Sequence, residues 1–494
     1  MNYQSTRNHA LTAASTAAVL RGIAPDGGLY ILKDFQGLSF DWRSALEKDT
    51  LGMAEQILAA LLPDYPDMHE LVRRAYTDKF ETPDLTPLVP VGDRYVLELF
   101  RGPTSAFKDV ALSMLPQLIT AARGLEGIDD EIVILTATSG DTGKAALEGF
   151  HDVDGTRIIV FFPEHGVSAV QKKQMVTQVG RNVCVCGVNG NFDDAQTGVK
   201  NTFAAVDAGD LLAGKGARLS SANSINIGRL APQVVYYFKA YADLWKQGRI
   251  ALGDPIDFVV PTGNFGDILA GYFAKAMGLP VARLVCASNA NDVLTEFIRT
   301  GVYDRNRPFY KTVSPSMDIL VSSNLERLLF LMSGCDDAYV ADLMAQLKSA
   351  GKYSITDEML KTLQEEFWAG CCNDEGTLKS IGEVWQKYGY LCDTHTGVAV
   401  RVYEAYRAAG DDTAAVVVST ASPYKFSKAV LGAVTDGKFT AENEFDMVSE
   451  LEAVTGLPAP APLKGLKGKA PRFTGVCAKA QMEAEVYKLL RIGK

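Results

Sequence analysis

The sequence has few cysteines and no long apolar run, and both shortages exclude classes of protein. Its eight cysteines form no CxxC pair and have no pair of histidines nearby. Neither a zinc site nor a disulfide framework is therefore indicated, and we expect reduced thiols and no metal. No stretch approaches the roughly 20 apolar residues of a membrane span, and the N-terminus lacks a basic start followed by an apolar run. These absences favour a cytoplasmic protein without a membrane partner.

Basic residues are also in deficit, with 49 Lys and Arg against 59 Asp and Glu and a net charge of -10. This balance argues against a general affinity for nucleic acid or an anionic membrane. A local basic pocket for a phosphorylated small molecule remains compatible with it. The apolar content of 47% and the 22% of charged residues are ordinary for a globular protein.

The length of 494 residues suggests about three structural units. Helical patterns at 42–62 and 68–80 predict an α-rich N-terminal region over residues 1–92. From Tyr95, short β-branched runs alternate with helical stretches, which is typical of parallel sheets wrapped by helices. We expect an α/β fold with two doubly wound, mainly parallel-sheet lobes at 93–235 and 236–440 and a cleft between them. Residues 441–494, in which the stretch from Gly456 to Pro471 is rich in Pro, Gly and Lys, are expected to form a C-terminal strap with a final helix from about Val476 to Leu490.

The segment from Glu98 to Asp109 places one lysine just beyond a turn. Residues 96–99 are predicted to form a short buried strand, Gly102 and Pro103 the turn, and Thr104 or Ser105 the cap of the next helix. Lys108 then lies just inside a helix with an apolar face, and a desolvated lysine is suited to nucleophilic chemistry. The alternative is an ordinary surface lysine in a first helical turn. Pro116 predicts that this helix kinks or ends early.

Three predicted strands run directly into polar loops. The strand at 131–137 precedes Thr138–Gly143, the strand at 258–260 precedes Pro261–Asp267, and the strand at 414–419 precedes Thr420–Phe426. Because carboxyl ends of parallel strands meet at one edge of a sheet, these loops are expected to converge on a ligand. The first loop is not a nucleotide-binding P-loop, since Thr138 and Ala145 replace the required Gly and Ser/Thr, and no GxGxxG fingerprint accompanies the second.

Several of these segments resemble the threonine synthase family, whose members belong to the fold-type-II pyridoxal-phosphate enzymes. Pro103-Thr104 followed by Ala106-Phe107-Lys108-Asp109 is similar to the lysine segment of that family. Five more segments resemble it in the same order and together span nearly the whole chain: Ser5–Arg7, Ala24–Tyr30, Thr138–Gly143, Gly263–Asp267 and Thr420–Phe426. The chain departs from the family pattern at Arg101, where the family usually carries a histidine.

The resemblance implies that the cleft holds pyridoxal 5'-phosphate, with Lys108 as its Schiff-base partner and catalytic base. It implies further that Thr420 contacts the pyridine nitrogen and that the loop at 263–267 holds the cofactor phosphate through main-chain amides. The residues of that loop are Gly263, Asn264, Phe265, Gly266 and Asp267. Ser139, Asp141 and Thr142 would bind the substrate's α-carboxylate, and Asn223, Asn226 and Arg229 a second phosphate. His395 either closes the pocket or is a capping or core histidine.

The reaction implied by the resemblance converts O-phospho-L-homoserine and water to L-threonine and phosphate. An alternative within the family is a phospho-lyase that releases 2-oxobutyrate and ammonia. Alternatives from another class are a phosphate-binding nucleotide hydrolase and a non-catalytic binding protein. The sequence does not distinguish a monomer from a dimer.

Overall fold

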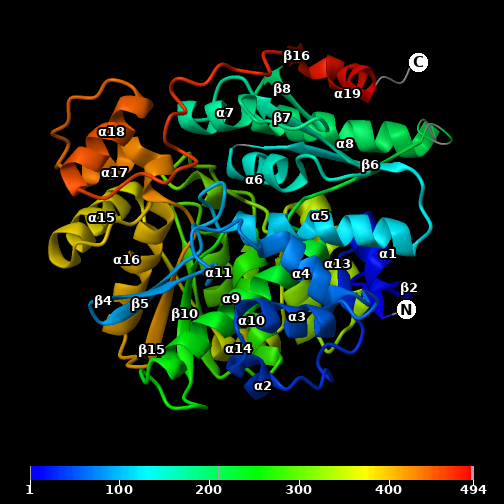
Figure 1. The fold of residues 1–494 in the computed structure, drawn as a ribbon. Coiled ribbons are helices and arrows are strands. Elements are labelled where there is room, and N and C mark those ends of the chain that lie inside the picture. The colour runs from blue at the N-terminus through cyan, green and yellow to red at the C-terminus, as the bar shows by residue number, and fades with distance from the viewer. Residues whose placement is uncertain (1, 139, 210–211, 213, 215, 491–494) are drawn as a thin grey trace.

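The computed structural model describes residues 2–138, 140–209, 212, 214 and 216–490. The described residues form two large sheets with helices on their faces, and Figure 1 shows the part with β6, β7 and β8 above the part with β10 and β15. No helix in the described ranges combines the length and the hydropathy needed to traverse a bilayer.

The larger sheet has six strands, and its neighbours run parallel except for the antiparallel pair β4 and β5. Its order is β14 (Phe367–Cys371), β11 (Val281–Ser288), β10 (Ile256–Pro261), β15 (Ala414–Ser419), β5 (Arg94–Glu98) and β4 (Leu88–Val91). The smaller sheet has five parallel strands. Its order is β16 (Val476–Ala478), β8 (Val183–Asn189), β7 (Thr156–Pro163), β6 (Glu131–Ala137) and β9 (Ala217–Ser220). The α/β fold class with two mainly parallel sheets is confirmed.

Two small antiparallel sheets complete the strands: β1 (Tyr3–Ser5), β2 (Asn8–Ala13) and β3 (Tyr30–Leu32) in one, and β12 (Val302–Asp304) and β13 (Lys352–Ser354) in the other. The helices of the first half are α1 (Ser15–Arg21), α2 (Trp42–Glu47), α3 (Thr50–Leu61), α4 (Met68–Tyr76), α5 (Lys108–Leu125), α6 (Asp141–Phe150), α7 (Ala169–Val176), α8 (Phe192–Gly209) and α9 (Ile227–Lys246). Those of the second half are α10 (Gly266–Ala276), α11 (Val293–Thr300), α12 (Leu325–Met332), α13 (Asp337–Ala350), α14 (Asp357–Glu366), α15 (Asp374–Tyr388), α16 (Thr394–Ala408), α17 (Ser427–Val434), α18 (Glu444–Thr455) and α19 (Met482–Leu490). Three short 3-10 helices are η1 (Pro315–Met317), η2 (Pro423–Phe426) and η3 (Lys479–Gln481).

Two segments belong to sheets other than those expected from their position in the sequence. The strand β5 was placed in the first lobe, but it pairs with β15 in the sheet of the second lobe, Glu98 opposite Ser419. Residues 476–478 were expected to begin the last helix, but they form β16, which adds a strand beside β8. Both segments are short, and a sheet edge elsewhere in the chain decides their pairing. The domain limits themselves stay a prediction.

The N-terminal region shares one hydrophobic core with the body of the protein. Buried side chains of α3 and α4, such as Ile57 and Val72, belong to the same cluster as Leu118 of α5 and Val234 of α9. The region is α-rich as expected, and the small sheet of β1, β2 and β3 was missed. Its strands are too short for a clear alternation of apolar and polar residues.

Pro116 lies within α5, and the helix continues beyond it to Leu125. The expectation that the helix ends early is therefore wrong. Proline cannot donate to the carbonyl four residues earlier, which here belongs to Leu112. This carbonyl faces α6 at Gly149, where an added Cβ would lie 1.9 Å from the Leu112 oxygen. The contact between the two helices therefore requires a glycine.

We expect Gly149→Ala to lower the free energy of unfolding by about 1–3 kcal/mol, because a backbone carbonyl cannot move aside for the methyl group as a flexible side chain can. Urea denaturation of the purified protein measures this loss. Gly124→Ala in the exposed last turn of α5 is the matched control, since no atom lies within 4 Å of its added Cβ. The control should gain about 0.5–1 kcal/mol from helix propensity. An unchanged stability of Gly149→Ala would contradict the close helix contact.

Candidate active site

The turn before α5 is bound by main-chain hydrogen bonds to the end of β15. Phe107 N–H donates to the Thr420 carbonyl at 2.8 Å and Ser422 N–H to the Ser105 carbonyl at 3.1 Å, while Ala106 bridges Ala421. Ser105 has a left-handed φ of 61°. These bonds fix the position from which Lys108 begins the helix.

Lys108 is the first residue of α5, and its side chain is buried, which excludes the alternative of an ordinary surface lysine. Its Nζ lies 4.0 Å from an Asp141 carboxylate oxygen and 4.5 Å from the centre of the Phe107 ring. Burial lowers the pKa of this amine to about 8. At pH 7 about a tenth of such an amine is unprotonated, against well under a thousandth of an ordinary lysine.

The cap of α5 differs from the expected one. The N-cap residue is Phe107, without a side-chain hydrogen bond, and neither Thr104 nor Ser105 caps the helix. Instead, the Asp109 carboxylate accepts hydrogen bonds from the Thr104 hydroxyl and, at 2.8 Å, from the Thr104 N–H. Burial raises the pKa of Asp109 to about 6. The turn is thus held from inside the helix.

The loop between β6 and α6 is organised by a threonine and two glycines. The Thr138 hydroxyl accepts from the N–H groups of Gly140 at 3.0 Å and Gly143 at 2.9 Å. Gly140 has a φ of 150°, and a Cβ there would lie 2.6 Å from Gln171. Thr142 is half-buried in the first turn of α6. Ser139, expected to bind substrate, lies outside the described residues.

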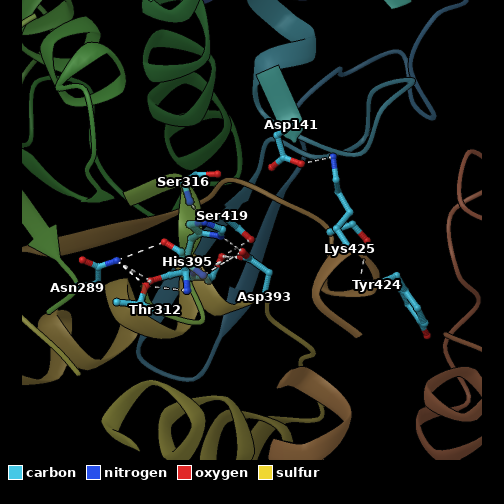
Figure 2. Close-up of polar contacts among 12 residues, drawn as sticks. Asp141, Asn289, Thr312, Ser316, Asp393, His395, Ser419, Tyr424 and Lys425 are labelled. Carbon is cyan, nitrogen blue, oxygen red and sulfur yellow. Dashed lines mark hydrogen bonds and ion pairs between the residues drawn. The ribbon is translucent and has the colours of Figure 1, made fainter. Parts of the chain in front are cut away.

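The Asp141 carboxylate is occupied by cations and an amide. Its Oδ1 atom lies 2.7 Å from Lys425 Nζ and accepts a hydrogen bond from Gln171 Nε2 at 2.8 Å. Figure 2 shows Lys425 reaching Asp141 across the gap between η2 and α6. Despite its burial, the lysines hold the pKa of Asp141 well below its usual range. An anionic side chain repels a carboxylate, so we do not assign Asp141 as a direct ligand of the substrate's α-carboxylate.

The loop expected to hold a phosphate, residues 263–267, joins β10 to the N-terminus of α10. The left-handed residue is Phe265, with a φ of 61°, rather than either glycine. Gly263 is required by a close approach, since a Cβ there would lie 2.7 Å from the Ser316 carbonyl oxygen. A Cβ at Gly266 would meet only Asn324 Nδ2, at an ordinary 3.4 Å. The protein itself thus leaves room for a side chain at Gly266.

The Asp267 side chain turns away from the main-chain amides of this loop. Its Oδ1 accepts hydrogen bonds from Tyr236 at 2.5 Å and Tyr237 at 2.9 Å, and its Oδ2 is buried without a partner among the described residues. Burial raises the pKa of Asp267 to about 6. Only the main-chain N–H of Asp267 is therefore suited to an anion.

The loop at 263–267 is connected to the loop at 220–226 by two buried residues, Asn324 and Arg327, to which the sequence assigned no role in the site. Asn324 Nδ2 donates to the carbonyls of Asn264 at 3.1 Å and Ser224 at 3.2 Å. Arg327 donates to Asn324 Oδ1, to the Ile225 carbonyl and, through Nε, to the Tyr30 carbonyl. This arginine is fully buried, and it links the N-terminal region to both loops.

Arg229 is buried in the first turn of α9. Its Nη1 donates to the Ala222 carbonyl at 2.9 Å, while its Nε has no partner among the described residues. Burial lowers its pKa to about 10. A buried guanidinium with an unpaired N–H and a neutral carbonyl as its acceptor is suited to an incoming anion.

The two asparagines predicted to act with Arg229 differ from it. Asn226 caps α9 by accepting from Gly228 N–H at 2.9 Å, and its Nδ2 donates to the carbonyls of Val19 and Ser221. Its amide is engaged in structural contacts, so we correct its assignment as a phosphate ligand. Asn223 is exposed at the turn before α9.

Thr420 follows β15 directly and is buried.

His395 is also buried and lies in a hydrogen-bond network with neighbouring polar residues (Figure 2). Asp393 accepts from His395 Nδ1 at 2.6 Å, and His395 Nε2 accepts from the Ser316 N–H at 3.1 Å. These contacts assign the proton to Nδ1. His395 is thus a buried core histidine, and it holds the segment that packs on Gly263.

Arg101, at the position of the family's usual histidine, binds two carboxylates. It donates to Glu98 at 2.6 Å and 2.8 Å and to Glu81 at 3.1 Å. About a third of its side chain is exposed. The residue therefore forms an ion-pair cluster rather than a free cation.

The sequence and the fold were compared with known proteins. Residues 77–421 match the family model described as pyridoxal-phosphate dependent enzyme, residues 2–88 that of the threonine synthase N terminus, and residues 396–484 that of the threonine synthase C-terminal region. The chain is 40% identical to "Threonine synthase-like 1" of Homo sapiens, over 84% of this chain and 57% of that protein. It thus spans less than two thirds of the length of that relative.

A bacterial relative and a solved structure match over more of their length. The chain is 39% identical to the threonine synthase of Pseudomonas aeruginosa, over 87% of this chain and 90% of that protein. A crystal structure titled as PLP-bound threonine synthase from Brucella melitensis superposes with a TM-score of 0.87 and 38% identity, over 99% of this chain and 100% of that chain. The chain therefore belongs to the threonine synthase family of pyridoxal-phosphate-dependent enzymes.

Proposed function

We propose that this protein is a threonine synthase that converts O-phospho-L-homoserine and water to L-threonine and phosphate. The observation that carries the proposal is Lys108, a buried amine whose pKa is lowered to about 8 and which begins a helix fixed to the end of β15. Membership of the family supports the choice of pyridoxal phosphate as the cofactor. The observed site supports it independently.

The residues of the site fit this cofactor in two respects. The loop at 263–267 offers main-chain amides at the N-terminus of α10, and the backbone at Gly266 carries no side chain that would shield them. Ser105 Oγ, in the turn before Lys108, and Arg229 Nε, in the first turn of α9, are buried polar atoms without a partner among the described residues. Such atoms call for ligand or solvent partners. Thr420, at the end of β15, is proposed to meet the pyridine nitrogen.

When bound, pyridoxal phosphate supplies an aldehyde that joins an amine and a ring that withdraws electrons from the substrate's α and β carbons. Lys108 Nζ is proposed to take up and return the protons at these carbons, which an amine of pKa about 8 does near neutral pH. Thr142 and the amides of the first turn of α6 are proposed to orient the substrate's α-carboxylate. Ser139 is likewise proposed to contact the α-carboxylate, and Asn223 the phosphate of the substrate.

The departing phosphate requires an anion site of its own in a protein of net charge -10. Arg229 is proposed to supply it, because its Nε is unpaired and its planar fork matches phosphate oxygens. The contact stabilises charge that grows on the leaving group, so it acts on turnover as well as on binding.

Our first prediction concerns the cofactor lysine. Borohydride reduction of the protein with bound pyridoxal phosphate, followed by peptide mapping, should place the pyridoxyl label on Lys108. Lys108→Ala should fold, take no label there and lose synthase activity. Product analysis with O-phospho-L-homoserine should give threonine and phosphate. Release of 2-oxobutyrate instead would favour the phospho-lyase. A label on another lysine would contradict the assignment of Lys108 as the cofactor lysine.

A second prediction separates the two glycines of the cofactor loop. Gly266→Ala should leave the unfolding free energy of the cofactor-free protein nearly unchanged, because the protein has room for the methyl group. It should weaken cofactor binding by about one to two decades through loss of charge-assisted hydrogen bonds. Gly263→Ala should instead lower the stability of the cofactor-free protein. Equal cofactor affinity of Gly266→Ala and wild type, measured by absorbance titration, argues against the phosphate site.

The third prediction tests the second anion site. Arg229→Lys keeps a cation but loses the fork, and Arg229→Met loses both, so the KM for O-phospho-L-homoserine should rise in that order. The expected loss for Met is about one to two decades, with a fall in kcat and an unchanged absorbance of the bound cofactor. Protection by inorganic phosphate against thermal unfolding should disappear in parallel. Normal kinetics in Arg229→Met would exclude this arginine as the phosphate ligand.

A further inference from the structure

One carboxylate, Asp141, serves two buried lysines that come from different parts of the chain. Lys425 Nζ lies 2.7 Å from Oδ1, whereas Lys108 Nζ lies 4.0 Å from Oδ2. Lys425 thus anchors the carboxylate at hydrogen-bond distance through one oxygen, while the other oxygen faces Lys108 from further away. Lys108 is left with a loose electrostatic contact only.

Lys425 is held firmly enough to keep this advantage. Its side chain is 0% exposed, and its Nζ also donates to the Thr104 carbonyl at 3.0 Å. Thr104 belongs to the turn that leads into Lys108, while Lys425 itself lies in η2, which follows β15. Gln171 fixes the same carboxylate oxygen from α7. Asp141 is thereby bound on the side away from Lys108.

We propose that Lys425 is a positioning residue for Lys108: by anchoring Asp141 through Oδ1, it holds the carboxylate 4.0 Å from Lys108 Nζ and keeps the amine available to the cofactor's aldehyde. The inference rests on the proposed function, in which Lys108 is the amine that joins the cofactor's aldehyde. In this role Lys425 acts through Asp141 on Lys108 and does not need to contact the substrate.

The other charges around Lys108 do not substitute for Lys425. Five charged groups on five elements act on Lys108: Asp109 of α5, Asp141 of α6, Arg229 of α9, Asp267 of α10 and Lys425 of η2. Burial is the largest cause of the lowered pKa of Lys108, Asp141 opposes it, and Lys425 and Arg229 add to it. Removal of Lys425 takes away one cation and also frees Asp141 to pair with Lys108. Both effects favour the protonated amine.

The test measures how the full-length protein, freed of cofactor, captures pyridoxal phosphate as a function of pH. The rate is followed by absorbance, and reduction with peptide mapping identifies the lysine. The wild-type midpoint should lie near pH 8. Lys425→Met should raise it by about one pH unit or more, and Asp141→Asn should lower it. Lys425→Arg, which keeps the cation, should restore the wild-type midpoint.

Lys428→Met is the matched control, because it removes the same charge from an exposed residue one helical turn further on. Its midpoint should equal that of the wild type. Opposite shifts in Lys425→Met and Asp141→Asn support the inference, because a merely structural role of the pair would not move the midpoint in two directions. If Lys425→Met does not fold, Lys425→Gln takes its place in the comparison with Asp141→Asn.

The outcomes distinguish the inference from the proposed function. Capture at Lys108 with the same midpoint in wild type, Lys425→Met and Asp141→Asn overturns the inference and leaves the proposed function intact. A wild-type midpoint above pH 10 also overturns it. No capture at Lys108 by the wild type overturns the proposed function itself.

Discussion

The main-chain bonds between the turn before α5 and the end of β15 are the constraint on which the site depends. Through them, a segment from early in the chain pairs antiparallel with the residues that follow β15. Lys108 and Lys425 each follow this antiparallel junction within a few residues along the chain, and Asp141 meets both.

The site concentrates positive charge inside an acidic protein. Lys108, Lys425 and Arg229 are all buried, and burial itself makes each more costly to keep charged. The molecule meets this cost in different ways: Asp141 neutralises Lys425, main-chain carbonyls accept hydrogen bonds from Lys425 and Arg229, and burial lowers the pKa of Lys108. The same solvent exclusion that makes the cations costly makes them strong ligands for a phosphate and a carboxylate.

Much of this was predictable from the sequence, because continuous β-branched runs followed by polar loops are strong local signals. The strands at 131–137 and 414–419 have the expected limits, and the loops that follow them do lie at the site. Pairings between distant polar residues were not predictable. Asn324 and Arg327 look like parts of an ordinary polar helix start, and Lys425 was within a recognised segment but had no assigned role. Only tertiary approach shows which carbonyl or carboxylate each one meets. The same holds for β5, whose sheet is chosen by the free edge of β15.

The smaller sheet is completed late during synthesis, because its edge strand β16 lies near the C-terminus. This strand covers the outer edge of β8, yet it follows β8 by more than half the chain. At about 5–20 residues per second, a ribosome needs roughly a quarter of a minute to a minute to make the intervening segment. During that time β8 presents unpaired main-chain groups, which attract strands of other chains. The late strand therefore acts as an intramolecular protector of its own sheet, and a nascent chain lacking it is the form most exposed to aggregation.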